Sequence, residues 1–493
     1  MNISYFFINI AGFIVLSIIA YAAYIYYVDK TQTRHSLRRN FPLLARGRWL
    51  MESVGHFFRY YMVADDRQEY PFNRADRTTV YKMAKNNNMT EAFGSSQKPD
   101  ELTFSFVHSN YPYIEKDSED YSPSVLVYGS TTENPYHAKS RINISAMSHG
   151  ALSNNAVLAL GKGAKMGGFL QNTGEGGLSQ SHIEGGADLI YQIGTAKYGC
   201  ANPDSSLNVD KLEILASNPQ IKMFEIKMSQ GAKPGKGGIL PAVKVTEDIA
   251  KARDIPVGQA SISPNGHVEV HDDSTMIELI YKVKKHSKKP TGIKLCLGSE
   301  EQFESLISTL AQKRFELIES GQPQEAELFT PDFITVDSSD GGTGAAPAAH
   351  MDAMGMHIRV SMPFVIQTLT KYNLRDRIRL IVSGKLMTPV WAAWAFANGA
   401  DAINIARGFL FSLGCIQARK CNKNTCPTGI TTHDPRFTNG LNPEEKSVRV
   451  YSYHKNLEHE LTNIAHSCGV KTYDLLNKKH IRKNELINIR CVN

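Results

Sequence analysis

The sequence predicts an α/β protein built on a (β/α)8 TIM-type barrel, with an N-terminal transmembrane helix and a helical C-terminal cap. From about residue 140, short apolar strand-like runs alternate with helical patterns over about 300 residues, which is enough for eight βα units. Several runs end directly in glycine- and charge-rich loops, which form the active face of such a barrel. An uncharged apolar segment at residues 3–28 predicts the membrane helix.

The composition is that of an ordinary globular protein. Hydrophobic residues make up 42% and charged residues 21% of the 493, which excludes disorder as the main state. A mean hydropathy of −0.29 excludes a protein with many membrane spans. The net charge of +7 is small for this length and is not gathered into arginine-rich runs, so we expect no nucleic-acid partner.

Residues 1–28 are predicted to be a membrane anchor. At about 1.5 Å per residue, the uncharged part exceeds the roughly 30 Å hydrocarbon core of a bilayer. Four basic residues follow between positions 30 and 39, which by the positive-inside rule lie in the cytoplasm. Two alternatives are a cleaved signal peptide, for which Ala20–Tyr21–Ala22 offers a cleavage-like triplet, and a buried core helix, which would need a polar stripe. We therefore expect a single-pass protein with its barrel on the cytoplasmic side.

Changes in pattern set the other boundaries. Residues 29–135 are mixed and polar, and we interpret them as a cytoplasmic linker and N-terminal extension. Residues 136–435 carry the alternating pattern of the barrel. Residues 436–493 are polar and helical, which predicts a C-terminal cap.

Three glycine-rich loops each follow a predicted strand. Residues 161–199 hold eleven glycines around Asn172–Gly177, where the chain average predicts about three. The other loops are Lys227–Gly238, which carries three lysines, and Asp340–Pro347. Because glycine lets a backbone approach a ligand closely, the three loops predict one large anionic or planar ligand across the barrel mouth. None of them matches a Walker or dinucleotide-binding motif.

Three of the seven cysteines lie within residues 415–426. Cys415, Cys421 and Cys426 follow the spacing C-x5-C-x4-C-P. Three thiolates in one short segment can hold three irons, which favours a 3Fe–4S cluster. On spacing alone, a zinc site completed by His433 and buried structural thiols stay open as alternatives.

Together these motifs resemble the FMN-binding domain of the glutamate synthase large subunit. The resemblance is carried by SAMSHGALS, NTGEGG, IKMSQGAKPGKGG, DGGTGAAP and LGCIQARKCNKNTCPTGITT over about residues 140–435, and by GLNPEEKSVRVYSYHKN after them. It implies a (β/α)8 barrel, FMN, a 3Fe–4S cluster and reduction of 2-iminoglutarate to glutamate.

The resemblance also implies roles for single residues. Cys415, Cys421 and Cys426 match the cluster ligands. Lys227 and Lys233 match lysines of the substrate pocket, and Glu175 lies in the same mouth as a proton or iminium partner. Lys294 would stabilise the anionic reduced flavin. The residues expected to bind the cofactor are Ser148, Lys294, Gly341, Gly342, Gly384, Arg407 and Gly408, the last three around the phosphate.

The sequence departs from the family pattern where substrate and ammonia are concerned. Ile239 replaces a glutamine that resembles a 2-oxoglutarate contact, and Leu178 replaces a glutamate. There is no room for a glutaminase domain, so we expect ammonia from solution or from a separate glutaminase subunit. Electrons would come from a donor such as ferredoxin or an NAD(P)H-dependent subunit.

The sequence therefore predicts an oxidoreductase acting on CH–NH2 donors. It would reduce a 2-imino acid, such as 2-iminoglutarate, to an amino acid, or run the reverse reaction. The alternative is a membrane-tethered flavin electron-transfer or scaffold subunit without imine chemistry, which Ile239 and Leu178 favour slightly.

Overall fold

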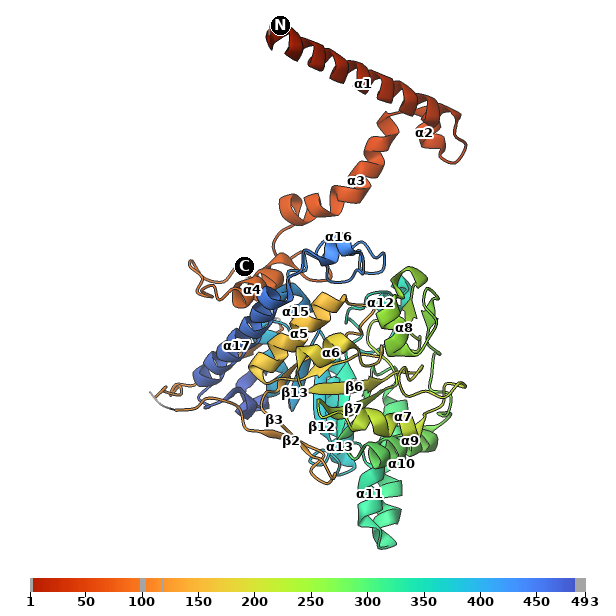
Figure 1. Ribbon diagram of the computed structural model, residues 1–493. Helices are drawn as coiled ribbons and strands as arrows, with labels where there is room; N and C mark the ends of the chain where they lie inside the picture. The colour runs from red at the N-terminus through yellow and green to blue at the C-terminus, as the bar shows by residue number, and fades with distance from the viewer. Residues whose placement is uncertain (1–2, 98–102, 117–118, 484–493) are drawn as a thin grey trace, which may run out of the picture. The chain divides into compact units, whose positions relative to one another are not determined.

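The computed structural model describes residues 3–97, 103–116 and 119–483, which fall into two compact units divided after Ala75 (Figure 1). In the first unit, Tyr5–Thr31 is long and apolar enough to cross a membrane, and its most apolar 18-residue window has no buried residue, although a signal sequence would meet the same criteria. The helical elements of this unit are α1 (Ile3–Thr31), α2 (Ser36–Asn40), α3 (Leu44–Phe58) and the π-helical turn η1 (Arg59–Val63).

The predicted barrel is confirmed in the second unit, where eight parallel strands form a closed sheet (Figure 1). Each strand pairs with the next along the chain, and the last pairs with the first through Ile403 and Ile142. Helices cover the outside, so the strands are buried on both faces and are rich in isoleucine, leucine and valine. The strands are β4 (Ile142–Ile144), β5 (Gln171–Asn172), β6 (Leu189–Ile193), β7 (Ile221–Lys227), β10 (Thr291–Leu295), β11 (Phe333–Asp337), β12 (Arg379–Ser383) and β13 (Ala402–Ile405).

Helices alternate with these strands, and their ends are set by local sequence. At the start of α5, Ser153 accepts a hydrogen bond from the Ala156 N–H, and Gly168 ends the helix with a φ of 67°. The helices of the outer layer are α5 (Asn154–Gly167), α6 (Gln180–Gly185), α7 (Val209–Ala216), α9 (Asp273–Ser287), α10 (Glu300–Glu319), α11 (Pro323–Phe329), α13 (Ile358–Lys371), α14 (Pro389–Ala397) and α15 (Arg407–Ser412).

The predicted helical C-terminal region is also confirmed. Its main element, α17 (Pro443–Ser467), packs along α5. A Cβ added at Gly163 of α5 would lie 2.5 Å from a Val450 methyl carbon, so the glycine permits this close approach. The remaining smaller elements are α4 (Arg74–Ala84), α8 (Glu247–Arg253), α12 (Ala348–Ala353), α16 (Pro435–Thr438), the 3-10 turns η2 (Ala242–Lys244), η3 (Tyr473–Leu475) and η4 (Lys478–His480), and the paired short strands β1 (Phe104–Phe106) with β14 (Ile481–Lys483) and β8 (Ile239–Leu240) with β9 (Ser261–Ile262).

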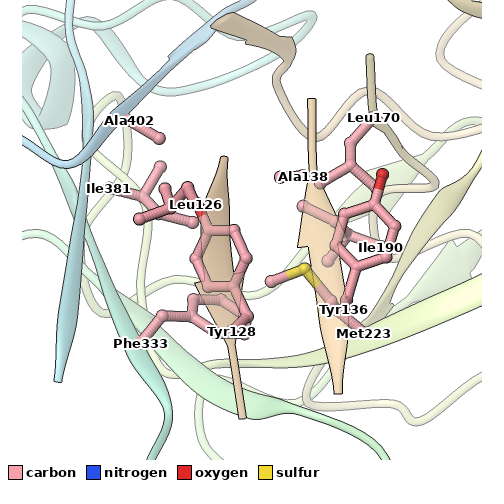
Figure 2. Close-up of a cluster of buried hydrophobic side chains, with 10 residues drawn as sticks. All are labelled: Leu126, Tyr128, Tyr136, Ala138, Leu170, Ile190, Met223, Phe333, Ile381 and Ala402. Carbon is pink, nitrogen blue, oxygen red and sulfur yellow. The ribbon is translucent and has the colours of Figure 1, made fainter. Parts of the chain in front are cut away.

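A hairpin of β2 (Leu126–Tyr128) and β3 (Tyr136–Ala138) closes the end of the barrel at which the strands begin (Figure 2). Tyr128 is fully buried, and its ring meets the edge of Phe333 at the start of β11, with centroids 5.8 Å apart. This end is therefore sealed by apolar side chains. The cluster consists of Leu126, Tyr128, Tyr136, Ala138, Leu170, Ile190, Met223, Phe333, Ile381 and Ala402.

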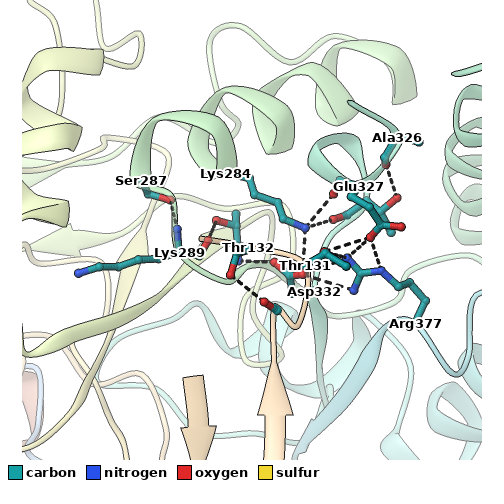
Figure 3. A network of polar contacts seen from close by, with 12 residues as sticks. Thr131, Thr132, Lys284, Ser287, Lys289, Ala326, Glu327, Asp332 and Arg377 are labelled. Atoms are coloured by element: carbon teal, nitrogen blue, oxygen red, sulfur yellow. Dashed lines mark hydrogen bonds and ion pairs between the residues drawn. The ribbon is translucent and has the colours of Figure 1, made fainter. Parts of the chain in front are cut away.

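A network of charged groups links α9 and α11 at the end of the barrel where the strands begin (Figure 3). Lys284 of α9 is buried, and its Nζ donates to the backbone carbonyls of Glu327 and Thr330, each at 2.8 Å, and to Asp332 Oδ1 at 2.9 Å. Arg377 makes ion pairs with the carboxylates of Glu327 and Asp332. Burial lowers the pKa of Lys284, and the charge of Asp332 opposes that shift. All three ammonium protons have an acceptor, so this lysine has a structural role.

Candidate active site

Close backbone contacts hold together the loops at the carboxyl ends of the strands. Gly174 has a φ of +67°, and a Cβ added there would lie 2.5 Å from the Ser148 backbone nitrogen. A Cβ at Gly231 would lie 1.7 Å from the Ser338 carbonyl oxygen. At these two positions glycine is needed for the packing of loop against loop, rather than for the approach to a ligand that the sequence suggested.

Lys227 and Glu175 form an ion pair inside this loop cluster. Lys227 is the last residue of β7, and its Nζ lies 2.9 Å from Glu175 Oε2 in the loop after β5. A Cβ at Gly238 would lie 2.7 Å from Glu175 Oε1, so the glycine leaves room for the carboxylate. Burial favours the neutral acid, but the charges of Lys227 and Lys233 outweigh it and lower the pKa of Glu175. Glu175 is therefore ionised at neutral pH.

Lys233 is buried in the same cluster, with 6% of its surface exposed. Among the described residues, its Nζ donates to the Gly237 carbonyl oxygen at 3.2 Å. Burial lowers the pKa of Lys233, and the nearby charge of Glu175 offsets part of that shift. Since an ammonium group carries three donors, Lys233 retains capacity to bind an anionic ligand.

Arg253, at the end of α8, is a site residue that sequence reasoning missed. Its Nη1 donates to Ser261 Oγ at 2.9 Å and its Nη2 to the His149 carbonyl at 3.2 Å, under the ring of Tyr198. Its Nε is buried without a partner in the described part of the chain, as are Gln230 Nε2 and His267 Nδ1. Because orphaned buried polar atoms are rare, they indicate a place for a polar ligand.

Lys294 is a further cation at the mouth, level with Lys227. It stands beside Lys227 in the register of β10 and β7, and its Nζ lies 3.3 Å from Asp337 Oδ2. Burial alone would lower the pKa of Lys294, but the charges of Asp337 and Glu225 outweigh it and raise that pKa. Lys294 is therefore a permanent cation. The Glu225 carboxylate is fully buried inside the barrel and accepts hydrogen bonds from Asn172, Gln192 and Thr335.

Arg407 and three of the predicted glycines lie in or beside the glycine-rich loop Asp340–Pro347. Arg407 Nη2 donates to the Thr343 carbonyl at 3.0 Å, and its Nε would lie 2.8 Å from a Cβ at Gly342. Gly384 has a φ of +153°, and a Cβ there would lie 2.3 Å from Ser338 Cβ. Gly341 leaves more space, because its added Cβ would be 3.0 Å from the Ser338 carbonyl oxygen.

Gly408 contacts the helical cap. A Cβ at this position would lie 2.3 Å from the Tyr453 hydroxyl of α17. That hydroxyl donates to the Met387 carbonyl at 2.8 Å, which fixes the tyrosine in place. The close contact accounts for glycine at position 408 without a ligand.

The three clustered cysteines lie on one segment after α15. Burial raises the pKa of Cys415 to about 11, and the charges of Cys421 and Cys426 add to the shift while Arg407 opposes it. Within the residues that the structure describes, no group of three or more His, Cys, Asp or Glu side chains is arranged to hold a metal ion. His433 Nε2 lies 2.9 Å from the Gly150 carbonyl oxygen.

Ile239 lies on the outer face of the β8–β9 pair. It is opposite Ile262, whereas Leu240 is opposite Ser261, whose Oγ binds Arg253. Successive side chains of a strand point to opposite faces, so Ile239 and Ile262 lie on the face away from Arg253. They are 49% and 67% exposed. Isoleucine in place of the family's glutamine at position 239 therefore changes the exposed face of the β8–β9 pair.

Comparison with known proteins gives consistent matches. A family model described as "Conserved region in glutamate synthase" matches residues 73–471. The chain is 35% identical over 521 residues to the glutamate synthase large subunit-like protein YerD of Bacillus subtilis (strain 168), covering 97% of this chain and 96% of that protein. It is 32% identical over 337 residues to the archaeal-type glutamate synthase (NADPH) of Thermotoga maritima, covering 68% of this chain and 60% of that relative.

Proposed function

Since this chain belongs to the glutamate synthase family, we propose that it is an FMN-dependent oxidoreductase that reduces a 2-imino acid, such as 2-iminoglutarate, to an amino acid, or runs the reverse reaction. As a family member it is an oxidoreductase acting on CH–NH2 donors and is related to enzymes of glutamate synthesis. The observation that carries the proposal is the cluster of Lys233 with the Lys227–Glu175 ion pair at the barrel mouth.

In this proposal, the cations of the mouth bind the substrate carboxylate. Lys233 has spare donors, and Arg253 has a buried Nε without a partner among the described residues. A charge-assisted hydrogen bond to a carboxylate contributes about 1.5–3 kcal/mol. Glu175 is ionised, so it serves as the partner of a protonated imine nitrogen rather than as a proton donor. The same carboxylate would hold the ammonium form of the amino acid in the reverse reaction.

The barrel mouth fits FMN. Lys294 is a buried permanent cation. A positive charge of this kind would stabilise the flavin ring when reduction gives it a negative charge. Ser148, Gly341 and Gly342 would flank the cofactor, and Gly384 with Arg407 would hold its phosphate. Bound FMN would supply the hydride chemistry that no side chain can provide. Gly408 would contribute its backbone to the phosphate site, while its missing Cβ leaves space for the Tyr453 hydroxyl.

We also propose that Cys415, Cys421 and Cys426 hold a 3Fe–4S cluster. Hydrogen bonds from Thr428 and Thr431 outweigh burial and lower the pKa of Cys426, which favours the thiolate that a metal needs. Buried Lys244 donates to the Cys421 carbonyl at 2.9 Å and adds positive charge beside the segment. Iron analysis after anaerobic purification tests the proposal: Cys421→Ser should lose the iron of the wild type, and equal iron in both would contradict it.

The proposed place of the protein is the membrane. Helix α1 would cross it once, and the basic residues after α1 would place the barrel in the cytoplasm. Ammonia would then come from solution or a separate glutaminase subunit, and electrons from ferredoxin or an NAD(P)H-dependent subunit. A C-terminal fluorescent fusion should be bright, and a C-terminal reporter active only outside the cytoplasm would contradict this topology.

Product analysis tests the catalytic proposal. The purified protein, supplied anaerobically with a chemical reductant, ammonia and a series of 2-oxo acids, should form the corresponding amino acid from at least one of them. The variant Lys233→Met tests the role of the lysine in this assay. Lys236→Met is its matched control, since Lys236 is exposed in the same loop as Lys233. Formation of no amino acid by protein that contains FMN would favour the electron-transfer alternative.

A further inference from the structure

Helix α3 is fixed beside the last turns of α1. Asp29 is 1% exposed in its side chain, and both carboxylate oxygens accept hydrogen bonds from Arg46, each at 2.8 Å. Asp29 also accepts the Leu43 N–H at 3.2 Å. A bidentate pair of this kind has a defined geometry. The start of α3 is therefore held at the end of α1.

One face of α3 is apolar and exposed. Leu44, Met51 and Phe58 are seven residues apart, so they lie along one side of the helix. Their exposed fractions are 81%, 54% and 55%. Arg48 and Arg59 lie on one flank of this stripe, about 60–80° around the helix axis from its centre. An exposed apolar stripe flanked by arginines is typical of a helix that lies in a membrane interface.

The surrounding chain is strongly basic. Residues 30–59 contain seven lysines and arginines and one acidic residue, Glu52, which gives an excess of +6. The Trp49 ring lies against the guanidinium of Arg38, whose Cζ is 4.4 Å from its centroid, and against the ring of His35. Tryptophan beside arginine is favoured at the level of lipid headgroups. The charge complements an anionic lipid surface.

We propose that α2 and α3 bind the anionic phospholipid surface of the bilayer that α1 crosses. Leu44, Met51 and Phe58 would enter the boundary between headgroups and acyl chains, and the arginines would contact lipid phosphates. The proposal rests on the membrane anchorage proposed above, because the Asp29–Arg46 contact keeps α3 at the level where α1 ends. A second attachment of this kind would hold the first unit flat on the membrane.

Hydrogen–deuterium exchange of the full chain in lipid nanodiscs tests this. Amides of residues 44–58 should exchange about tenfold more slowly in discs with one third phosphatidylglycerol than in phosphatidylcholine discs, and 0.5 M salt should remove much of the difference. A charge variant should lose the difference, and so should an apolar variant carrying Leu44→Gln, Met51→Gln and Phe58→Gln. The charge variant carries Arg38→Gln, Arg39→Gln, Arg48→Gln and Arg59→Gln.

A matched control removes four exposed lysines of the second unit and should keep the lipid-dependent protection. Equal exchange in both lipids, with the protein present in both kinds of disc, would overturn the lipid proposal alone and leave a protein partner for this face. Failure of the protein to enter either kind of disc would overturn the anchorage as well. The control carries Lys282→Gln, Lys455→Gln, Lys478→Gln and Lys479→Gln.

Discussion

The two ends of the barrel each bury a lysine, and the two lysines have different surroundings. At the closed end, Lys284 Nζ has three acceptors within 2.9 Å, one of them the Asp332 carboxylate (Figure 3). At the mouth, Lys233 Nζ has the Gly237 carbonyl at 3.2 Å among the described residues. Burial lowers the pKa of both. Burial and a shifted pKa therefore do not distinguish a structural from a functional lysine, whereas the completeness of its hydrogen bonding does.

The largest effect is expected at the closed end. Lys284→Met should lower the free energy of unfolding by about 3–5 kcal/mol, because it removes the ammonium group 2.9 Å from buried Asp332 and leaves that carboxylate with only the longer Arg377 ion pair at 3.3 Å. Chemical denaturation measures this. Lys285→Met is the matched control, since Lys285 is exposed on the same helix, and should leave the unfolding midpoint unchanged. Equal midpoints for the two variants would show that the network does not stabilise the fold.

Lys233→Met should impair substrate binding and leave stability almost unchanged, in contrast to Lys284→Met. It should raise the KM for the substrate by about 10- to 150-fold, the equivalent of 1.5–3 kcal/mol, because a charged contact to the carboxylate is lost. The unfolding midpoint should change little, since Lys233 has an incomplete set of partners. Lys236→Met should leave KM unchanged within twofold. A KM for Lys233→Met that matches this control would contradict the assigned role.

Glu175→Gln should shift the pH dependence of binding. The charge of Glu175 opposes the burial that lowers the pKa of Lys233, so its removal should lower that pKa further. Substrate binding needs the ammonium form and is lost as pH rises through the pKa of Lys233. The upper limb of the KM–pH profile should therefore move to lower pH in Glu175→Gln. An unmoved limb, or one displaced to higher pH, would contradict the coupling of the two residues.

The smallest effect is expected from Tyr128→Phe in the hairpin that closes the barrel. The Tyr128 hydroxyl is buried without a hydrogen-bond partner in the described structure, so its removal costs no interaction. The free energy of unfolding should stay the same or rise by up to about 1 kcal/mol. A loss of more than 1 kcal/mol in denaturant unfolding would show that the hydroxyl has a partner.

The sequence was sufficient to predict the barrel because its apolar runs and helical patterns alternate regularly. It did not reveal the closing hairpin, whose strand β2 lies in the stretch interpreted as a linker and whose strand β3 begins the stretch assigned to the barrel. Strands of three residues carry little periodic signal, and β2 and β3 are held by packing against residues far along the chain, such as Phe333. Strand β5 is equally weak as a pattern, because its two residues are glutamine and asparagine.

The roles of Lys227, Lys233, Glu175 and Lys294 were predicted from the resemblance to the family, whereas the strand pattern predicts only that residues near strand ends meet at the mouth. Lys227, Glu175 and Lys294 stand at or near strand ends, so the barrel brings them together. Arg253 lies on α8, in a long excursion after β7, and its return to the mouth depends on tertiary contacts that leave no local pattern. The phosphate role of Gly408 stays a prediction from its motif, and the structure adds that its missing Cβ leaves room for the Tyr453 hydroxyl.

The central claim is that the cations and Glu175 at the mouth bind an amino or imino acid against FMN. The most direct measurement is the flavin absorbance of the anaerobic holoenzyme during titration with amino acids, glutamate first. The account predicts bleaching by at least one amino acid, at concentrations at least tenfold higher for Lys233→Met than for wild type. Flavin that no amino acid bleaches, and that no 2-oxo acid with ammonia reoxidises, would contradict the account.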